Sequence, residues 1–182
     1  PYLNEFNSSR GTELVSIAGV HVEPFGAYSS KIKRLADLPQ GANVVIPNDA
    51  TNGGRALLLL AKHDLITLKD PTNILSTIKD ISGNPKHLKF QELEAAQLPR
   101  SLADVDASVI TMNYVMSSGL SPKDQGIFLE DKDTPLAVMI IAAREKDKDQ
   151  PAYQKFVKYY QSESVKKFIA EKYKGTIVPA WE

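Results

Sequence analysis

The stretch PNDATNGGRALLLLAKHDLI, residues 47–66, decides how this sequence is interpreted. It follows a predicted strand at residues 43–46, whose continuous Val-Val-Ile run is typical of a parallel strand covered on both faces. Small and polar residues come next, and the pattern then predicts a helix over residues 53–63. In open α/β sheets, ligands bind beyond the carboxyl ends of the strands. This strand-to-helix junction is therefore a candidate ligand site.

The junction carries groups that attract an anion. Backbone N–H groups and the helix dipole favour negative charge at a helix N-terminus, and Gly53 and Gly54 would let a ligand approach the backbone closely. The guanidinium of Arg55 is a planar fork that suits a carboxylate or a phosphate. Because the stretch has neither the Gly-Lys-Ser/Thr end of a Walker A motif nor a G-x-G-x-x-G pattern, a carboxylate is the better prediction.

The same stretch also has a purely structural interpretation. In this interpretation Asp49, Thr51 or Asn52 merely caps the helix, and Arg55 is solvated on its surface. The stretch alone does not decide between the two interpretations.

Strands and helices alternate along the chain, which predicts an α/β fold. The expected strands are residues 14–18, 43–46, 87–93, 107–111, 126–130 and 136–143. The expected helices are residues 32–38, 53–63, 72–81, 98–102, 113–118, 152–161 and 164–174. The helix over residues 72–81 is inferred from apolar residues at i, i+1, i+4 and i+7, and Pro151 is expected in the first turn of the next-to-last helix.

Two extended segments, residues 25–29 and 136–143, bracket the block of strands and helices between them. Paired as antiparallel hinge strands, they would divide the chain into two lobes. Residues 30–137 would form an inserted lobe, and residues 1–29 and 138–182 would form an outer lobe.

The composition is that of a globular protein and argues against several function classes. Of the 182 residues, 42% are hydrophobic, and 22 basic residues balance 22 acidic ones, so no broad basic field favours nucleic-acid binding. The absence of cysteine rules out disulfides, thiolate catalysis and cysteine-based metal sites. The three histidines lack metal-ligand spacing, and no catalytic triad or carboxylate pair stands out. Neither an enzyme activity nor a cofactor is expected.

A second candidate site follows the predicted strand at residues 107–111. Asn113 and Tyr114 lie at the carboxyl end of that strand, and an asparagine amide offers both a donor and an acceptor, which suits the ammonium and carboxylate of an amino acid. His21, Phe25 and Tyr28 lie beside the first hinge segment, where aromatic walls would suit an apolar ligand side chain. A helix cap at residue 113 and core packing of the aromatic residues are the alternatives.

Four blocks of the sequence are highly specific. They read GVHVEPFGAYSSKIKRLADLP, VVIPNDATNGGRALLLLAKHDLITLKD, NPKHLKFQELEAAQLPRSLADVDASVI and GIFLEDKDTPLAVMIIAAREKD. Together the blocks closely resemble the NlpA-type lipoproteins, the substrate-binding components of methionine ABC importers, and the resemblance extends over essentially the whole chain.

The resemblance implies a type II periplasmic-binding-protein fold, with two α/β lobes joined by hinge strands, that binds methionine or a methionine-containing dipeptide between the lobes. It implies delivery to an ABC permease and its ATPase outside the cytoplasmic membrane, from a precursor that is lipid-anchored in the cell envelope. By motif position, Arg55 would hold the ligand carboxylate, and Asn113 would contact its amino or carboxylate group. The other implied ligand-binding or pocket residues are Asn52, Tyr114, His21, Phe25 and Tyr28.

The sequence departs from the family pattern at its start. Family members begin with a signal peptide, a lipidated cysteine and the first strands of the outer lobe, whereas this chain begins at Pro1 with a predicted half-helix over residues 2–6. The expectation is a chain that starts partway through a longer precursor, with an incomplete outer lobe and self-association through exposed sheet edge and core. The alternative function is a non-transporting surface adhesin or scaffold on the same fold, and an enzyme is third.

Overall fold

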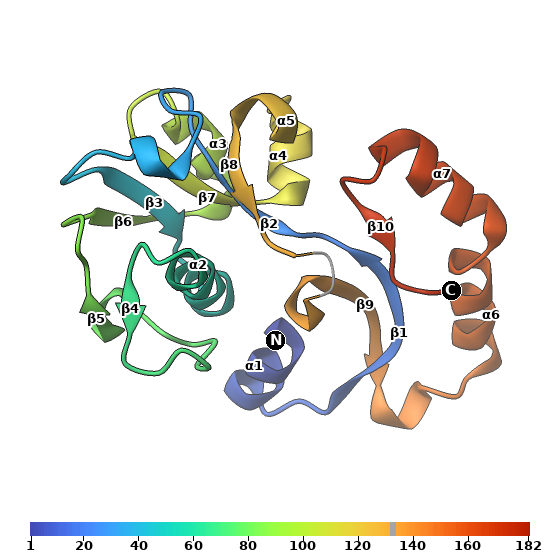
Figure 1. Ribbon diagram of the computed structural model, residues 1–182. Helices are drawn as coiled ribbons and strands as arrows, with labels where there is room; N and C mark the ends of the chain where they lie inside the picture. Colours follow the sequence, from blue (N-terminus) through green and yellow to red (C-terminus); the bar gives the residue numbers. More distant parts are fainter. Residues whose placement is uncertain (132–133) are drawn as a thin grey trace. The chain divides into compact units, whose positions relative to one another are not determined.

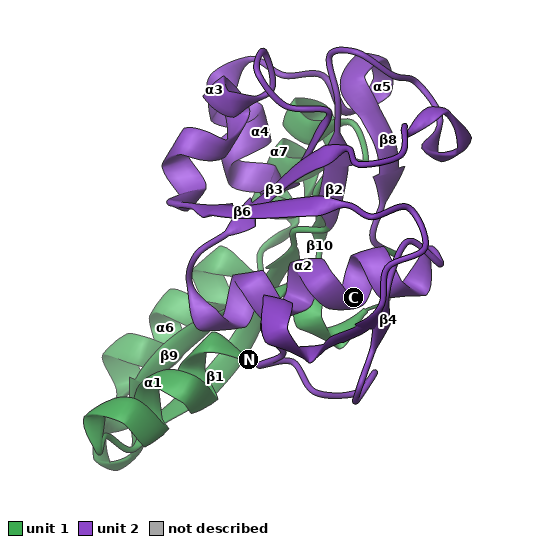
Figure 2. Ribbon diagram, turned by 90° about the vertical axis from the view of Figure 1, so that its left-hand side faces the viewer, with its two compact units in different colours: residues 1–24, 131–182 green, residues 25–130 purple. Residues whose placement is uncertain are grey.

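The computed structural model describes residues 1–131 and 134–182 and divides the chain into two compact units (Figures 1 and 2). Unit 1 comprises Pro1–Pro24 and Asp131–Glu182, and unit 2 comprises Phe25–Glu130. The predicted inserted lobe includes Lys132 and Asp133, which lie outside the described residues. The lobe bounds predicted from the sequence stay a prediction.

Unit 2 is built on a five-stranded mixed sheet with the strand order β6-β3-β7-β2-β8. β3 is parallel to β6 and β7, and β2 is antiparallel to β7 and β8. The strands are β2 (Phe25–Tyr28), β3 (Asn43–Pro47), β6 (Lys89–Leu93), β7 (Ala107–Thr111) and β8 (Gly126–Leu129). β4 (Thr67–Leu68) and β5 (Ile81–Gly83) pair separately. The strands predicted around residues 43–46 and 107–111 are confirmed.

Helices cover both faces of this sheet. α2 (Ala50–Lys62) lies on one side, and α3 (Leu98–Ser101) and α4 (Met112–Ser118) lie on the other (Figure 1). α5 (Pro122–Gln125) precedes β8, and short 3-10 turns occur at Leu35–Asp37, Ile78–Asp80 and Ala95–Gln97. Leu57 and Leu60 of α2 share one buried cluster with Val44 and Ile46 of β3. Burial of this apolar surface holds α2, and with it Arg55, against the sheet.

α2 begins earlier than the sequence pattern predicts. Asp49 is the N-cap, and its Oδ1 accepts the backbone N–H of Asn52 at 3.0 Å. The cap satisfies an N–H group that has no partner inside the helix. Ala50 therefore starts the helix three residues before the predicted start, and Gly53 and Gly54 lie inside it rather than at its first positions.

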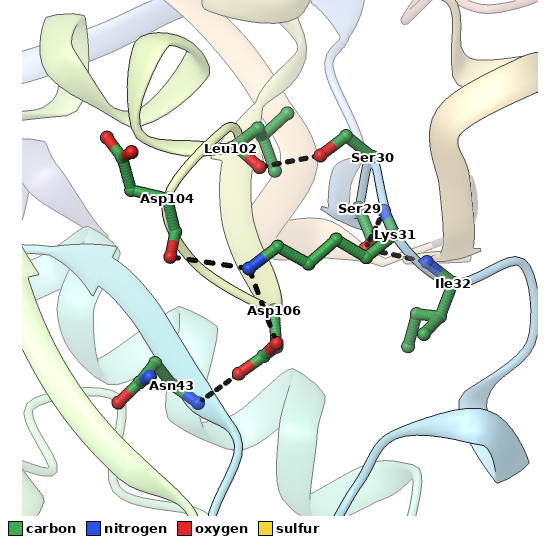
Figure 3. A network of polar contacts seen from close by, with 8 residues as sticks. All are labelled: Ser29, Ser30, Lys31, Ile32, Asn43, Leu102, Asp104 and Asp106. Carbon is green, nitrogen blue, oxygen red and sulfur yellow. Dashed lines mark hydrogen bonds and ion pairs between the residues drawn. The ribbon is translucent and has the colours of Figure 1, made fainter.

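The opposite end of the sheet is held by a polar network (Figure 3). Asp106 accepts the backbone N–H of Asn43 at 2.8 Å, and its other carboxylate oxygen lies 3.5 Å from Lys31 Nζ. The Ser30 hydroxyl donates to the carbonyl oxygen of Leu102 at 2.7 Å. The network ties the amino ends of β3 and β7 to the segment that leaves β2.

The helix predicted over residues 72–81 is wrong. The Asp70 carboxylate accepts the N–H of Thr72, and the Asn73 side chain accepts the N–H of Leu75. Thr77 and Asp80 close a capping box around a single 3-10 turn. Short polar side chains that bond nearby backbone groups compete with helix formation, and here they outweigh the apolar spacing.

Unit 1 contains a three-stranded sheet with the order β10-β1-β9. Its strands are β1 (Leu14–Val22), β9 (Val138–Arg144) and β10 (Val178–Pro179). Its helices are α1 (Tyr2–Arg10), α6 (Pro151–Tyr160) and α7 (Glu163–Tyr173), with 3-10 turns at Pro135–Ala137 and Glu145–Asp147. The two C-terminal helices and the first-turn position of Pro151 are confirmed.

The predicted pairing of the two hinge segments is wrong. β9 pairs with β1, from Leu14 opposite Arg144 to Val22 opposite Val138, and the segment Phe25–Tyr28 pairs instead with β7 and β8. The reason is burial. Every residue of β2 is buried, so β2 needs a neighbour on each side within a covered sheet, whereas β9 alternates between half-buried and exposed residues and suits a smaller sheet.

Among the residues that the structure describes, no helix has the length and apolar character that crossing a membrane requires.

We expect Gly54→Ala to lower the free energy of unfolding, although alanine normally favours a helix interior over glycine. A Cβ atom at Gly54 would lie 2.0 Å from the carbonyl oxygen of Ile74, a backbone atom that cannot rotate away. Overpacking of this kind costs about 1–3 kcal/mol. Denaturant unfolding of the variant measures the loss.

Gly19→Ala is the matched control for this prediction. Its added Cβ would lie no closer than 3.4 Å to any neighbour, which is ordinary van der Waals contact. If Gly54→Ala is as stable as Gly19→Ala, the close approach of α2 to the backbone at Ile74 does not constrain the fold.

Candidate functional site

The sheet of unit 2 brings several chain segments together at the carboxyl ends of its parallel strands. β3 ends at Pro47 and leads into α2, and β7 ends at Thr111. Because β2 runs antiparallel, its first residue, Phe25, lies opposite Thr111. β8 ends at the same edge, so Glu130 comes directly after Leu129, which pairs with Gly26. This is the edge at which open α/β sheets bind ligands.

Arg55 and Glu130 form a buried ion pair at this edge. Arg55 Nε donates to Glu130 Oε1 at 3.0 Å, and Arg55 Nη2 donates to Glu130 Oε2. Only 7% of the Arg55 side chain and 8% of the Glu130 side chain are exposed. Two parallel contacts between a guanidinium and a carboxylate fix both distance and orientation. The interpretation of Arg55 as a solvated surface residue is therefore wrong.

Phe25 contacts both members of the pair. The Cζ atom of Arg55 lies 4.5 Å from the centre of the Phe25 ring, a cation–π arrangement. The Phe25 backbone N–H donates to Glu130 Oε2 at 3.0 Å, and the Glu130 N–H donates to the Phe25 carbonyl oxygen at 2.8 Å. The ring, the backbone of β2 and the carboxylate together hold the guanidinium in one orientation.

Asn52 lies one turn before Arg55 and takes part in the helix cap. Its side-chain amide donates to Asp49 Oδ2 at 3.1 Å, and the Thr51 hydroxyl donates to Asp49 Oδ1 at 3.2 Å. Capping by Asp49 is confirmed. The cap and the buried arginine occur together, so the two interpretations of the stretch do not exclude each other.

Tyr28 packs on the face of the sheet that carries α4. Its hydroxyl lies 4.0 Å from Met112 Sδ, and burial raises the pKa of this hydroxyl well above its usual value. Tyr28 is therefore neutral over the physiological range. Phe25, by contrast, belongs to the core cluster that contains α2. The two aromatic residues of β2 thus lie on opposite faces.

Asn113 and Tyr114 lie in the first turn of α4, directly after β7. Asn113 is exposed and Tyr114 is half-buried. Tyr114 lines a surface groove of about 360 Å³ between α3 and α4, together with Ala96, Pro99, Arg100, Ser117, Ser118 and Leu120. The helix predicted after β7, closed by Gly119 in the left-handed conformation, is confirmed.

His21 belongs to β1 of unit 1, whereas the other predicted site residues belong to unit 2. His21 Nε2 lies 3.2 Å from Glu23 Oε1, and Nδ1 lies 3.4 Å from the Tyr160 hydroxyl. The Tyr160 ring in turn packs edge-on against Trp181. Within unit 1, His21 thus connects β1 to α6.

Two polar groups at the carboxyl edge of unit 2 were not predicted as site residues. Glu130 is the last residue of the predicted strand at residues 126–130, so the rule that singled out Asn113 at a strand end applies to it equally. Thr111 Oγ1 is buried and has no hydrogen-bond partner in residues 1–131 and 134–182. Over the same residues, no cluster of side chains suited to a metal ion occurs.

Comparison with known proteins identifies the family. A model of the NlpA lipoprotein family matches residues 1–181. The chain belongs to the NlpA lipoprotein family. The family resemblance of the sequence is thereby confirmed.

Relatives and solved structures agree with this assignment. The D-methionine-binding lipoprotein MetQ of Salmonella typhi is 47% identical over 183 residues, which cover 100% of this chain and 67% of the relative. A nutrient binding protein from Burkholderia cenocepacia, solved bound to methionine, is 47% identical with a TM-score of 0.95, covering 100% of this chain and 76% of that one. An ABC transporter periplasmic substrate-binding protein from Coxiella burnetii is 42% identical with a TM-score of 0.92, covering 99% and 75%. These structures confirm the predicted α/β fold class.

A double-mutant cycle should detect strong coupling between Arg55 and Glu130. Removing either partner breaks a buried bidentate contact between charged groups, which costs about 3–5 kcal/mol. Removing both leaves the local net charge unchanged. For Arg55→Met, Glu130→Gln and the double variant, we expect a coupling energy of about 2 kcal/mol or more in denaturant unfolding.

Arg34 and Asp37 provide the matched control pair. Their contacts have the same bidentate form, at 3.1 and 2.8 Å, but their side chains are 76% and 38% exposed. Water screens such a pair, so its coupling should be much weaker. Equal coupling in the two cycles would show that burial does not strengthen the Arg55–Glu130 interaction.

Proposed function

We propose that this protein is an extracytoplasmic solute-binding protein that captures methionine, or a methionine-containing dipeptide, and delivers it to an ABC permease. The observation that carries the proposal is the buried, rigidly held guanidinium of Arg55 at the ligand-binding edge of the sheet, on a chain that is 47% identical to a methionine-bound relative. In this proposal, Arg55 binds the ligand carboxylate and the exposed Asn113 contacts the ligand amino or carboxylate group.

The remaining candidates have supporting roles in the proposal. Phe25 stacks on Arg55 and sets the position of its fork, and Asn52 keeps the start of α2 in place through Asp49. Tyr114, His21 and Tyr28 are proposed as neighbours of the ligand. Glu130 binds the Nε and Nη2 atoms of the guanidinium.

The proposed contacts are sufficient for a micromolar dissociation constant. Hydrogen bonds to charged groups contribute about 1.5–3 kcal/mol each, and burial of a thioether side chain contributes about 1.5–3 kcal/mol. A micromolar dissociation constant corresponds to about 8 kcal/mol. Two or three charged contacts together with an apolar pocket would therefore reach it.

The proposal places the protein in the cell envelope, outside the cytoplasmic membrane, as a lipid-anchored partner of the permease and its ATPase. The relatives support this placement because they are named lipoproteins and a transporter substrate-binding protein. Their names describe binding rather than catalysis, and we propose no enzyme activity and no cofactor. Self-association stays a prediction.

Arg55→Lys tests the role of the guanidinium. Lysine keeps the positive charge but lacks the planar fork, so we expect methionine affinity to fall by about 10- to 100-fold, the loss of one hydrogen bond to a charged group. Isothermal titration calorimetry on the full-length protein measures this. Arg34→Lys, at an exposed ion pair of the same unit, should leave affinity unchanged. If a folded Arg55→Lys variant binds methionine with normal affinity, Arg55 does not bind the ligand carboxylate.

Native mass spectrometry of the purified protein separates transport from scaffolding. A solute-binding protein is expected to retain a small ligand with the mass of methionine or of a methionine dipeptide. The ligand should disappear after unfolding and refolding, and it should return when methionine is added. A protein that carries no ligand under either condition would favour the adhesin or scaffold alternative.

A further inference from the structure

The two C-terminal helices of unit 1 present large aromatic side chains to solvent. α6 and α7 follow each other along the chain and lie on the side of the unit 1 sheet opposite α1 (Figure 1). The exposed fractions of Phe156, Tyr159 and Phe168 are 55%, 66% and 53%. Single apolar residues are common on protein surfaces, but several large ones on neighbouring elements mark an interaction surface.

A lysine accompanies the most exposed ring of each helix. In α6, Lys155 Nζ lies 5.9 Å from the centre of the Tyr159 ring, and in α7, Lys172 Nζ lies 5.4 Å from the centre of the Phe168 ring. Each lysine is four residues from its ring, so the two side chains share one side of the helix. We call these four residues the aromatic–lysine face.

The charge of both helices is positive, although the whole chain has as many acidic as basic residues. α6 contains Lys155 and Lys158 and no acidic residue. α7 contains three lysines and two glutamates, and the glutamates lie 4.0 and 3.8 Å from Lys166 and Lys167. Lys172 therefore adds to the excess positive charge of α6.

The attachment of the two helices to unit 1 uses other side chains. The Gln161 side chain, directly after α6, donates to the carbonyl oxygen of Gly19 at 2.8 Å, and the Tyr160 hydroxyl lies 3.4 Å from His21 Nδ1. In α7, Ile169 is buried. The exposed rings and lysines thus remain on the outer sides of helices whose inner sides are already fixed.

We propose that the aromatic–lysine face docks unit 1 on an anionic phospholipid surface. Helices that combine lysines with exposed aromatic and aliphatic side chains lie in the plane of the membrane interface. The rings of Tyr159 and Phe168 would enter the headgroup region, and the ammonium groups of Lys155, Lys158 and Lys172 would meet lipid phosphates. A protein partner would have to match this particular spacing, whereas an anionic bilayer offers negative charge and apolar depth at every point.

The inference does not depend on the proposed function. A lipoprotein lies close to a bilayer whether it transports a solute or serves as a scaffold, and the chain belongs to a lipoprotein family. Methionine affinity should be the same in every variant described below, because none of the altered residues is a proposed ligand contact. A failure to bind vesicles would thus leave the proposed function untouched.

Vesicle co-sedimentation of the full-length protein, produced without a covalent lipid, tests the docking. We expect binding to vesicles of phosphatidylglycerol and phosphatidylcholine in equal parts, and at least about tenfold weaker binding to phosphatidylcholine alone, since each lysine near an anionic surface contributes about fivefold in affinity. Salt should weaken the binding, because the Debye length falls from about 10 Å at 0.1 M to about 3 Å at 1 M.

A charge-swapped variant locates the binding surface. Lys155→Glu combined with Lys158→Glu should lower the affinity for the anionic vesicles by at least about tenfold. The matched control is Lys89→Glu combined with Lys123→Glu, which gives the same net charge through two exposed lysines of unit 2. The control should bind as the wild-type protein does, to within the effect of the changed net charge on long-range attraction.

The rings are tested separately from the charge. Tyr159→Ser combined with Phe168→Ser should weaken binding while its salt dependence persists, and Leu75→Ser, at an exposed apolar residue of unit 2, should not weaken it. Phe168→Trp reports the position of the ring directly. Its added fluorescence, measured against the wild-type protein, should be that of a solvated indole and should shift to shorter wavelength with anionic vesicles.

The opposite results would overturn the proposal. It fails if the protein binds neither kind of vesicle or binds both equally, and it fails if the folded charge-swapped variant binds like its control. A buried indole in Phe168→Trp before vesicles are added would show that another part of the full-length chain covers the face. A dimer in sedimentation without vesicles, dissociated by the ring substitutions, would show that the face binds a second copy instead.

Discussion

The buried ion pair between Arg55 and Glu130 is the interaction on which the rest of unit 2 depends. It joins α2, which follows β3, to the end of β8 through two residues that are 75 positions apart along the chain. Each charge loses hydration on burial, and the bidentate contact between them compensates for part of that loss. The pair therefore requires α2, β2 and β8 to be correctly placed at the same time.

The sheet order explains how that placement is achieved. β2 lies between β7 and β8 and starts at the edge where β3 and β7 end. Phe25 consequently contacts both Arg55, on the helix that follows β3, and Glu130, which follows β8. The polar network around Asp106 secures the opposite edge, where it uses the backbone of Asn43 rather than a buried charge (Figure 3). The amino ends of the strands are thus held by partly exposed polar contacts, whereas the buried Arg55–Glu130 pair lies at the carboxyl ends.

The sequence was informative wherever the secondary structure of a short segment depends on the residues of that segment alone. Continuous apolar runs at β3 and β7 predict buried strands, and Gly119 predicts the end of α4. Arg55 could be singled out because its place after a strand is local information. The role of Glu130 and the pairing partner of β9 could not be predicted from the sequence, since both depend on which strands become neighbours. The turn at residues 72–81 was missed because its polar side chains bond locally and override the apolar spacing.

The helix cap and the buried arginine are linked by geometry. Asp49 sets the first turn of α2, and one turn later the helix presents Arg55 to the sheet edge. The absence of a Cβ at Gly53 and Gly54 lets α2 lie close to the backbone of Pro47 and Ile74, so the helix has little freedom to shift or rotate. The Phe25 ring and the Glu130 carboxylate then contact the guanidinium of this long side chain and restrict its orientation. The capping residues, the two glycines and the carboxylate thus all determine the position of one guanidinium. For that reason a stretch that resembles an ordinary helix start can also place a buried arginine at the carboxyl ends of the strands.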